Sequence, residues 1–188
     1  MAECISPESL PEIIYSLGKK RVFLALDGPS AAGKTTLAGS LADRFGWTLL
    51  HMDDFFLRPE QRTAERYAMP GGNVDHERFR AEVLEPLHAG REAVYRPLDC
   101  ATLTLAEPIC VQAGSVVLAE GAYACHPALW ELFDLHLFLP VDPDTQRERI
   151  LHRNGPKAEM FFDRWIPLEQ TYFDAYDLPD KCDYILTR

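Results

Sequence analysis

Residues 28–35, GPSAAGKT, are the feature that most constrains what this chain can fold into. They match the pattern G-x-x-x-x-G-K-[ST] in full. An apolar run (21–26) precedes them, and apolar residues follow at every fourth position, as Leu37, Leu41 and Phe45. Between a strand and a helix, the glycines of this pattern let successive backbone N–H groups turn inward around phosphate oxygens. The sequence therefore predicts a phosphate-binding loop at the start of a helix.

We expect this loop to bind ATP together with Mg²⁺. Lys34 is predicted to reach the β- and γ-phosphates, and the Thr35 hydroxyl to ligate the metal ion. The other positions assigned to the nucleotide are Gly28, Ser30, Ala31, Ala32, Gly33 and Thr36. The sequence leaves a preference for ATP over GTP open.

Further apolar runs indicate strands that are buried on both faces, as in parallel sheets. They lie at 47–52, 115–121 and 135–139, with a last strand at 183–186 and short strands within 93–111. Helical segments separate these runs. Because strands alternate with helices, we predict the P-loop NTPase fold, an α/β fold with a parallel sheet and helices on both faces. A length of 188 residues, 47% of them hydrophobic, favours a single domain over 1–188.

Three regions of that domain have distinct expected roles. An N-terminal helix is predicted within residues 1–20. Residues 57–74 contain two prolines and two glycines and no apolar period, which predicts a mobile loop on the substrate side. The region 142–160 is predicted to be a lid helix, with Asp142 as its N-cap.

Composition excludes several classes of function. A formal net charge of −10 argues against a nucleic-acid surface. No apolar run is long enough to cross a membrane, and the N-terminus lacks a basic, apolar leader. Five scattered cysteines fit reduced thiols. We therefore expect a cytoplasmic protein whose partners are small molecules, and a homo-oligomer is left open.

Charged residues at strand ends are the candidates for chemistry, because ligands of parallel sheets bind beyond the carboxyl ends of the strands. Glu120 ends an apolar strand and is predicted to be a second ligand on the magnesium side. Asp53 and Asp54 follow another strand, and one of them should orient the acceptor hydroxyl and take its proton. Side chains alternate along an extended segment, and we favour Asp53, with Asp54 as the open alternative.

Arginines on the lid helix are candidates for stabilising the transferred phosphoryl group. Arg149 and Arg153 are four residues apart and share a helix face, whereas Arg147 points elsewhere. Guanidinium groups on that face would balance the charge that develops during transfer. We therefore count Arg149 and Arg153, but not Arg147, among the predicted catalytic residues.

The order of these motifs resembles that of uridine kinase-like P-loop kinases. The resemblance covers about residues 21–186 and rests on segments 28–36, 53–56, 73–76, 118–121 and 142–153. This group includes uridine–cytidine kinases and is related to phosphoribulokinase and bacterial pantothenate kinase. The resemblance implies ATP-dependent phosphorylation of a small-molecule hydroxyl, above all the 5′-hydroxyl of a nucleoside.

The resemblance also implies roles for single residues. Asp53 matches the catalytic aspartate, which would lie beside both acceptor and metal, and Asp75 matches an aspartate that holds ribose hydroxyls. Glu120 matches the acidic residue of the magnesium site, and Arg149 and Arg153 match the arginines of the lid helix. In uridine kinases a tyrosine and a histidine contact the pyrimidine, but the segment 98–103, LDCATL, has leucines at those positions. We therefore expect poor or unselective use of pyrimidine nucleosides, unless Tyr95 or an aromatic residue near Tyr67 restores the contact.

Other functions of the same loop remain alternatives. A GTP switch would need N-K-x-D and D-x-x-G segments, which are absent, and a mechanical ATPase usually has a longer chain. A kinase of nucleotides would need several arginines, and Arg58, Arg62 and Arg66 lie in one segment. We prefer an acceptor without phosphate, because the carboxylates of Asp53 and Asp75 would repel a phosphate group. A kinase of another alcohol or vitamin, and an ATP-hydrolysing module that is not a kinase, stay open.

Overall fold

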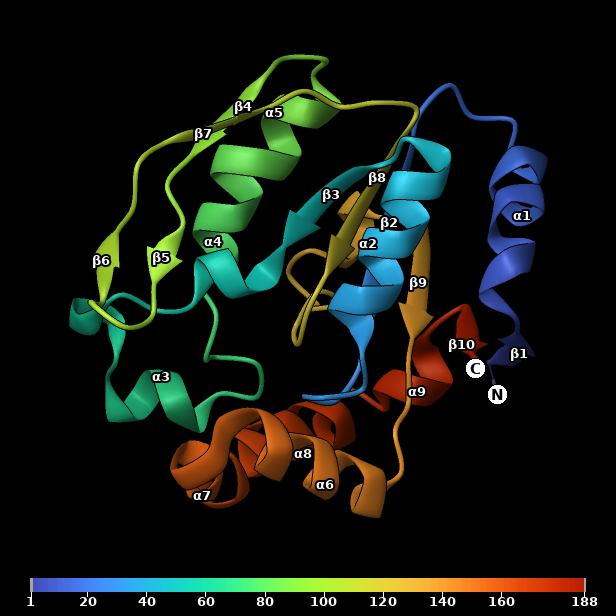
Figure 1. Cartoon of the computed structure of the whole chain (residues 1–188). Helices are drawn as coiled ribbons and strands as arrows, with labels where there is room; N and C mark the ends of the chain where they lie inside the picture. Colours follow the sequence, from blue (N-terminus) through green and yellow to red (C-terminus); the bar gives the residue numbers. More distant parts are fainter. Residues whose placement is uncertain (1, 188) are drawn as a thin grey trace.

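A six-stranded parallel sheet in the order β1-β10-β9-β2-β8-β3 forms the centre of the protein, in a computed structural model that describes residues 2–187 (Figure 1). The central strands β2, β8 and β9 are apolar and buried along their length, because helices cover both of their faces. The six strands are β1 (Glu3–Ile5), β2 (Val22–Asp27), β3 (Thr48–His51), β8 (Val116–Glu120), β9 (Leu135–Phe138) and β10 (Tyr184–Leu186).

Alternate side chains of the strands enter two hydrophobic cores, one on each face of the sheet. The first face packs against α1 (Leu10–Ser16) and α2 (Lys34–Phe45), through side chains such as Leu10 and Leu41. The second packs against a continuous helical segment made of α4 (His76–Phe79), the π-helical η4 (Arg80–Leu84) and α5 (Glu85–His88), and against α8 (Ile166–Ala175).

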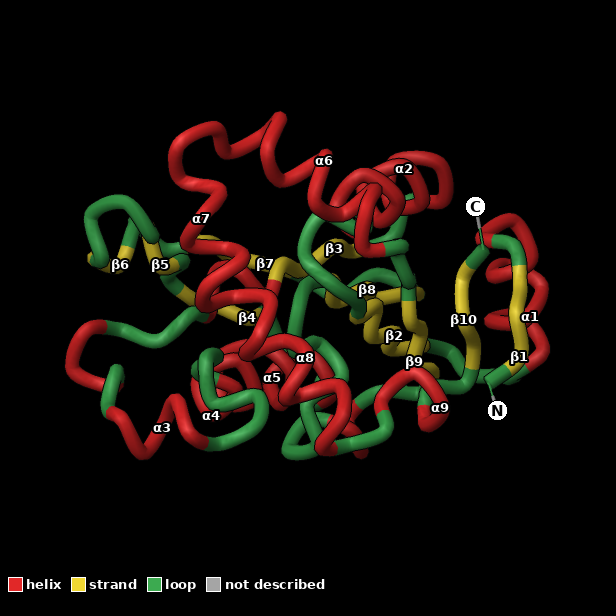
Figure 2. Tube along the Cα trace, turned by 90° about the horizontal axis from the view of Figure 1, so that it is seen from below, coloured by secondary structure: helices red, strands yellow, loops and turns green. Residues whose placement is uncertain are grey.

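A C-terminal helical cover crosses the molecule beyond the carboxyl ends of the strands. It consists of α6 (Pro143–Asn154), α7 (Ala158–Met160), the π-helical η7 (Phe161–Trp165) and α8. Figure 1 shows this cover, in orange and red, below the sheet, and Figure 2 shows it from below. The short helix α9 (Leu178–Lys181) then leads into β10.

Two small antiparallel pairs and a short helix lie to one side of the sheet, away from α2 in both Figure 1 and Figure 2. The pairs are β4 (Ala93–Tyr95) with β7 (Ile109–Val111), and β5 (Leu98–Asp99) with β6 (Thr104–Leu105). The helix is α3 (Ala64–Ala68). This part of the chain supplies one wall of the cavity described below.

The structure confirms the predicted fold class, and it differs from the sequence analysis at two elements. The N-terminal region contains β1 as well as the expected helix, because β1 pairs with the distant strand β10. The segment 57–74 was expected to be a loop, but it contains η3 (Pro59–Gln61) and α3. Thr63 caps α3 by accepting from Arg66 N, and the Arg66 side chain donates to the Gly72 and Val74 carbonyls. These contacts order a segment that has no apolar period.

Among residues 2–187, no helix combines the length and the apolar character needed to span a bilayer.

A buried histidine gives the fold a specific dependence on pH. His126 is 7% exposed, stacks on His76 with ring centroids 4.0 Å apart, and accepts from Ala128 N through Nδ1. Burial, together with the charges of His76 and Arg66, lowers the pKa of His126 to about 3. His126 is therefore neutral in the folded protein at pH values where an unfolded chain protonates it.

We expect the free energy of unfolding to fall as the pH is lowered from about 6.5 towards 3, by at most about 1.4 kcal/mol per pH unit from this residue. In that window the unfolded state binds a proton that the folded state does not. Urea unfolding at several pH values should show a shallower slope for His126→Gln than for the wild type. His152→Gln, at an exposed histidine, is the control. Equal slopes for His126→Gln and the wild type would contradict the assignment.

Candidate active site

A cavity of about 1200 Å³ lies between the carboxyl ends of the strands and the C-terminal helical cover. It brings together residues that are far apart in the sequence. Of the residues predicted to form the site, the cavity is lined by Ser30, Ala31, Gly33, Lys34, Thr35, Thr36, Asp53, Glu120, Arg149 and Arg153. Gly28 and Ala32 belong to the loop but are not part of the lining, and Ala32 is buried.

The phosphate loop between β2 and α2 has the backbone geometry that its glycines predict. Gly28 has φ +143°, and a Cβ atom there would lie 2.3 Å from the Leu139 carbonyl oxygen, so a side chain does not fit. Gly33 also has positive φ, at 93°. Lys34 Nζ donates to the carbonyl oxygens of Gly28 (2.7 Å) and Pro29 (2.9 Å), which folds the ammonium group back over the loop. The loop is thus formed, with its lysine at the cavity.

Asp27, the last residue of β2, holds the start of the phosphate loop in place through hydrogen bonds to its carboxylate. Its buried carboxylate accepts from Gly28 N at 2.7 Å and from the Tyr172 hydroxyl of α8 at 2.9 Å. It also accepts from the backbone N–H groups of Tyr123 and Cys125, which follow β8. Burial raises the pKa of Asp27, and these donors act against that shift. Asp27 therefore joins β2, the segment after β8 and the helical cover under the loop.

Thr35 and Glu120 meet at the cavity floor, as the sequence predicts for a magnesium site. The Thr35 hydroxyl lies 3.1 and 3.2 Å from the two Glu120 carboxylate oxygens, and His51 Nδ1 lies 2.6 Å from Oε1. Hydroxyl and carboxylate oxygens are the ligands that Mg²⁺ prefers, with water and substrate phosphates completing its shell. Among residues 2–187, no group of three or more His, Cys, Asp or Glu side chains is placed to hold a metal. The residues present fit an Mg²⁺ ion that arrives with a nucleotide.

The two aspartates after β3 have different surroundings. The Asp53 side chain lines the cavity and is accessible from it, whereas Asp54 is not part of the lining. Asp54 Oδ2 instead accepts from the Tyr95 hydroxyl at 3.1 Å. Partial removal of the carboxylate from bulk water inside the cavity raises the pKa of Asp53, and so does the charge of Glu120, while Lys34 lowers it. Of the two carboxylates, Asp53 is therefore the one that is open to the cavity.

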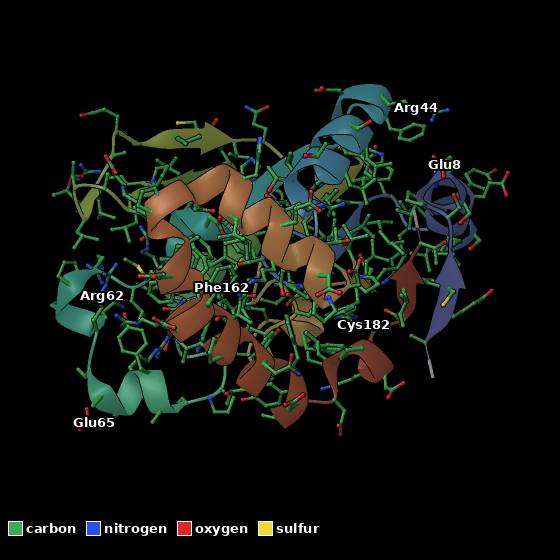
Figure 3. All side chains as sticks on the ribbon, turned by 60° about the horizontal axis from the view of Figure 1, so that its bottom comes forward. Glu8, Arg44, Arg62, Glu65, Phe162 and Cys182 are labelled. Atoms are coloured by element: carbon green, nitrogen blue, oxygen red, sulfur yellow. The ribbon has the colours of Figure 1, made fainter. Side chains whose placement is uncertain are left out.

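The lid-helix arginines approach the phosphate loop to different degrees. Arg149 Nη1 donates to the Ala31 carbonyl at 3.1 Å, so α6 contacts the loop directly. Arg153 lines the same cavity, with its guanidinium 5.5 Å from the Phe161 ring centroid. Arg147 is outside the lining and lies over Phe162, which Figure 3 labels on the helical cover. The structure thus places the two selected arginines, and not Arg147, at the cavity.

Of the three residues assigned to an acceptor, Asp53 lines the cavity, whereas Asp75 and Tyr95 do not. Asp75 is 2% exposed and caps α4, where its carboxylate accepts from Arg78 N at 3.1 Å and from Gln61 Nε2 at 2.7 Å. Tyr95 is buried against Phe55, with its hydroxyl on Asp54. The sequence order around Asp75 matched a substrate-binding pattern, but here helix capping uses that carboxylate.

We expect Asp75→Ala to destabilise the protein by about 1–3 kcal/mol, because the variant loses a helix cap and leaves buried donors unpaired. Urea unfolding measures this loss. Asp142→Ala is the matched control, since Asp142 caps α6 by accepting from Thr145 N at an exposed site. A variant of Asp75 with unchanged stability but a raised KM for a ribose-bearing acceptor would restore the role that the sequence predicted.

Glu169, Arg62 and Arg164 line the cavity but were not among the site residues selected from the sequence, and neither was His51. Glu169 of α8 accepts from Ser30 N at 2.9 Å and from the Ser30 hydroxyl, and burial raises its pKa.

Arg164 lies over the Tyr67 ring of α3, and Arg62 precedes that helix. His51 is outside the lining and contacts the cavity residue Glu120. Each is a single charged residue without a motif around it. Only His51, at the end of an apolar strand beside Asp53, carried a positional signal.

Similarity to known proteins is found at the level of the fold and not at the level of the sequence. No family model matches the chain, and no curated protein matches it. Among solved structures, a Bacillus stearothermophilus protein described as a "possible uridine kinase" has a TM-score of 0.70 and 19% identity, over 96% of this chain and 98% of its own. D-glycerate 3-kinase from Cryptococcus neoformans has a TM-score of 0.65 and 15% identity, over 95% and 92%.

A third similar structure is a protein from Silicibacter sp. TM1040, provisionally named a fructose transport system kinase. It has a TM-score of 0.64 and 19% identity, and the likeness covers 97% of this chain and 100% of that one. The class defined here is therefore the P-loop α/β fold, in a single domain. More particularly, the chain shares the fold of these solved structures, which is the fold that the uridine kinase-like resemblance predicted.

Proposed function

We propose that this protein is an ATP- and Mg²⁺-dependent kinase that phosphorylates the hydroxyl group of a small molecule. One observation carries the proposal: the phosphate loop, the Thr35–Glu120 pair and the accessible Asp53 carboxylate line one cavity. A nucleotide site alone would need the first two. The third places a proton acceptor beside that site, which phosphoryl transfer to an alcohol requires.

The residues divide the work in the following way. When bound, MgATP supplies the phosphoryl group and leaves as ADP, with Thr35 and Glu120 as the residues that would hold the metal. Asp53 takes the proton of the acceptor hydroxyl while the oxygen of that hydroxyl forms the new bond to phosphorus. Lys34, Arg149 and Arg153 balance the negative charge on the phosphoryl oxygens.

A nucleoside 5′-hydroxyl is the acceptor that the sequence resemblance favours. Its expected contacts, Asp75 to the ribose and Tyr95 to the base, both have other partners in the structure. The nucleoside assignment therefore depends on the resemblance alone, and the wall near α3 is the better guide to the acceptor. A kinase of another small alcohol or vitamin is the second candidate, and it is developed below.

The test is a screen for ADP formation from MgATP with nucleosides, sugars, vitamins and hydroxy acids as acceptors. We expect ADP to form in proportion to a phosphorylated product and only when an acceptor is present. Lys34→Ala serves as the inactive reference. ADP formation at the same rate without any acceptor would instead support an ATP-hydrolysing module and would remove the kinase proposal.

A further inference from the structure

The cavity contains more arginine than ATP binding explains. Arg149 and Arg153 extend from α6 beside the phosphate loop, where the nucleotide phosphates would lie. Arg62 and Arg164 line a separate part of the same cavity, formed by the segment before α3 and the end of η7. Figure 3 labels Arg62 beside α3, at the side of the helical cover. These two arginines are outside the phosphate loop and the lid helix.

Neither arginine has an acidic partner. Across residues 2–187, no carboxylate lies within 4.0 Å of the Arg62 or Arg164 guanidinium. Arg62 uses only Nε, which donates to the Leu57 carbonyl at 2.9 Å, so its two terminal nitrogens are left for a ligand. Neighbouring arginines outside the cavity are paired: Arg58 with Glu60, and Arg66 with Glu77. Arg62 and Arg164 thus lie at the cavity without a paired carboxylate, in a protein with a net charge of −10.

Arg164 lies over two aromatic rings, which restrict the movement of its guanidinium. Its Cζ lies 4.6 Å from the Tyr67 ring centroid and 4.7 Å from that of Trp165. Tyr67 and Trp165 also line the cavity, together with Phe56. A planar guanidinium positioned in this way can bind both oxygens of a carboxylate or phosphate, and apolar walls strengthen such a contact.

Arg62 lines the same cavity as Asp53, the proposed proton acceptor, and Cys100 lines it with them. Burial raises the pKa of the Cys100 thiol, the Asp53 carboxylate raises it further, and the Arg62 guanidinium lowers it, so both charges act on this thiol. A single acceptor in this cavity can therefore contact Arg62 through one group and present a hydroxyl to Asp53 through another.

We propose that Arg62 and Arg164 bind an anionic group of the acceptor, so that the substrate is a small alcohol that carries a carboxylate or a phosphate. The inference rests on the proposed kinase function and names its substrate class. The sequence analysis favoured an acceptor without phosphate, because Asp53 and Asp75 would repel a phosphate group. Asp75 lies outside the cavity, and Arg58 and Arg78 lie within 4.0 Å of its carboxylate, so only Asp53 remains to repel an anion there.

The first experiment compares matched acceptors that differ only in charge. Glycerate against glyceramide and pantothenate against pantothenol test a carboxylate, and glycerol 3-phosphate against glycerol tests a phosphate. For each compound, kcat/KM is measured from ADP formation, and binding is measured by calorimetry with the enzyme saturated by a non-hydrolysable Mg²⁺–ATP analogue. We expect the anionic member to be favoured by about 10–100-fold in at least one class, which identifies the group.

The second experiment changes the two arginines. Arg62→Met and Arg164→Met should raise the KM of the favoured anionic acceptor by about 10–100-fold, with the KM of MgATP unchanged. Arg62→Lys keeps a charge and should lose less. Arg80→Met is the control, because Arg80 is exposed, pairs with Glu85 and lies outside the cavity lining.

The outcomes separate this inference from the kinase proposal. If neutral members react and bind as well as anionic ones, the inference is wrong although a kinase remains. If no compound reacts and no anion binds better than its neutral partner, the inference is also wrong. The kinase proposal is then tested only by the acceptor screen. Arginine variants that raise the KM of MgATP instead would assign Arg62 and Arg164 to the nucleotide.

Discussion

Replacing Asp53 with asparagine is expected to lower kcat by about 10²–10⁴-fold, the usual range for the loss of a general base. Asparagine has nearly the same shape but cannot accept the proton of the acceptor hydroxyl. The KM of MgATP should change little, because the carboxylate acts on the acceptor. Steady-state kinetics with the best acceptor from the screen measures both parameters.

Asp54→Asn is the matched control, since it makes the same change at the next residue. The Asp54 carboxylate accepts from Tyr95, and its backbone carbonyl accepts from Arg78 at 2.9 Å, so this variant should mainly affect stability. A larger loss of kcat in Asp54→Asn than in Asp53→Asn would transfer the role of the base to Asp54. Equal and small losses would indicate that neither carboxylate takes the proton.

The predicted site residues that the structure brings to the cavity are those fixed by local sequence. The phosphate loop is a continuous pattern whose backbone geometry is set within eight residues. Asp53 and Glu120 could be placed because apolar strands end next to them, and parallel strands bring their carboxyl ends to one edge. The preference for Asp53 over Asp54 was based on alternation along an extended segment, but both residues lie in the 3-10 helix η2 (Met52–Phe55), so that reason does not apply. The preference now depends on Asp53 lining the cavity and Asp54 lying outside the lining.

The features of the site that the sequence did not indicate depend on contacts between distant segments. The resemblance assigned Asp75 to ribose hydroxyls, whereas in the structure its carboxylate lies outside the cavity and accepts from Gln61 and Arg78. Glu169 reaches Ser30 across 139 residues, and no local pattern marks it. Arg62 and Arg164 differ from paired arginines only through what lies beside them in the fold.

The second large effect is expected at Lys34, on the side of the cavity where ATP, the phosphoryl donor, would bind. Lys34→Ala is expected to lower kcat/KM by about 10²–10³-fold, because the ammonium group no longer balances charge on the transferred phosphoryl oxygens. The affinity for MgATP should also fall, since the same charge contacts the bound phosphates. Kinetics and a binding titration with MgATP measure the two effects, and the second separates this variant from Asp53→Asn.

The fold should survive this change, because the hydrogen bonds of Lys34 go to the loop carbonyls of Gly28 and Pro29, and the side chain lines the cavity, so water can take its place. Lys157→Ala is the control, at an exposed lysine outside the cavity lining. Lys34→Arg keeps the charge but not the size, and should retain more activity than Lys34→Ala if charge is the main contribution. Near-full activity in a folded Lys34→Ala protein would exclude a phosphate-binding role for this loop in catalysis, and with it the kinase proposal.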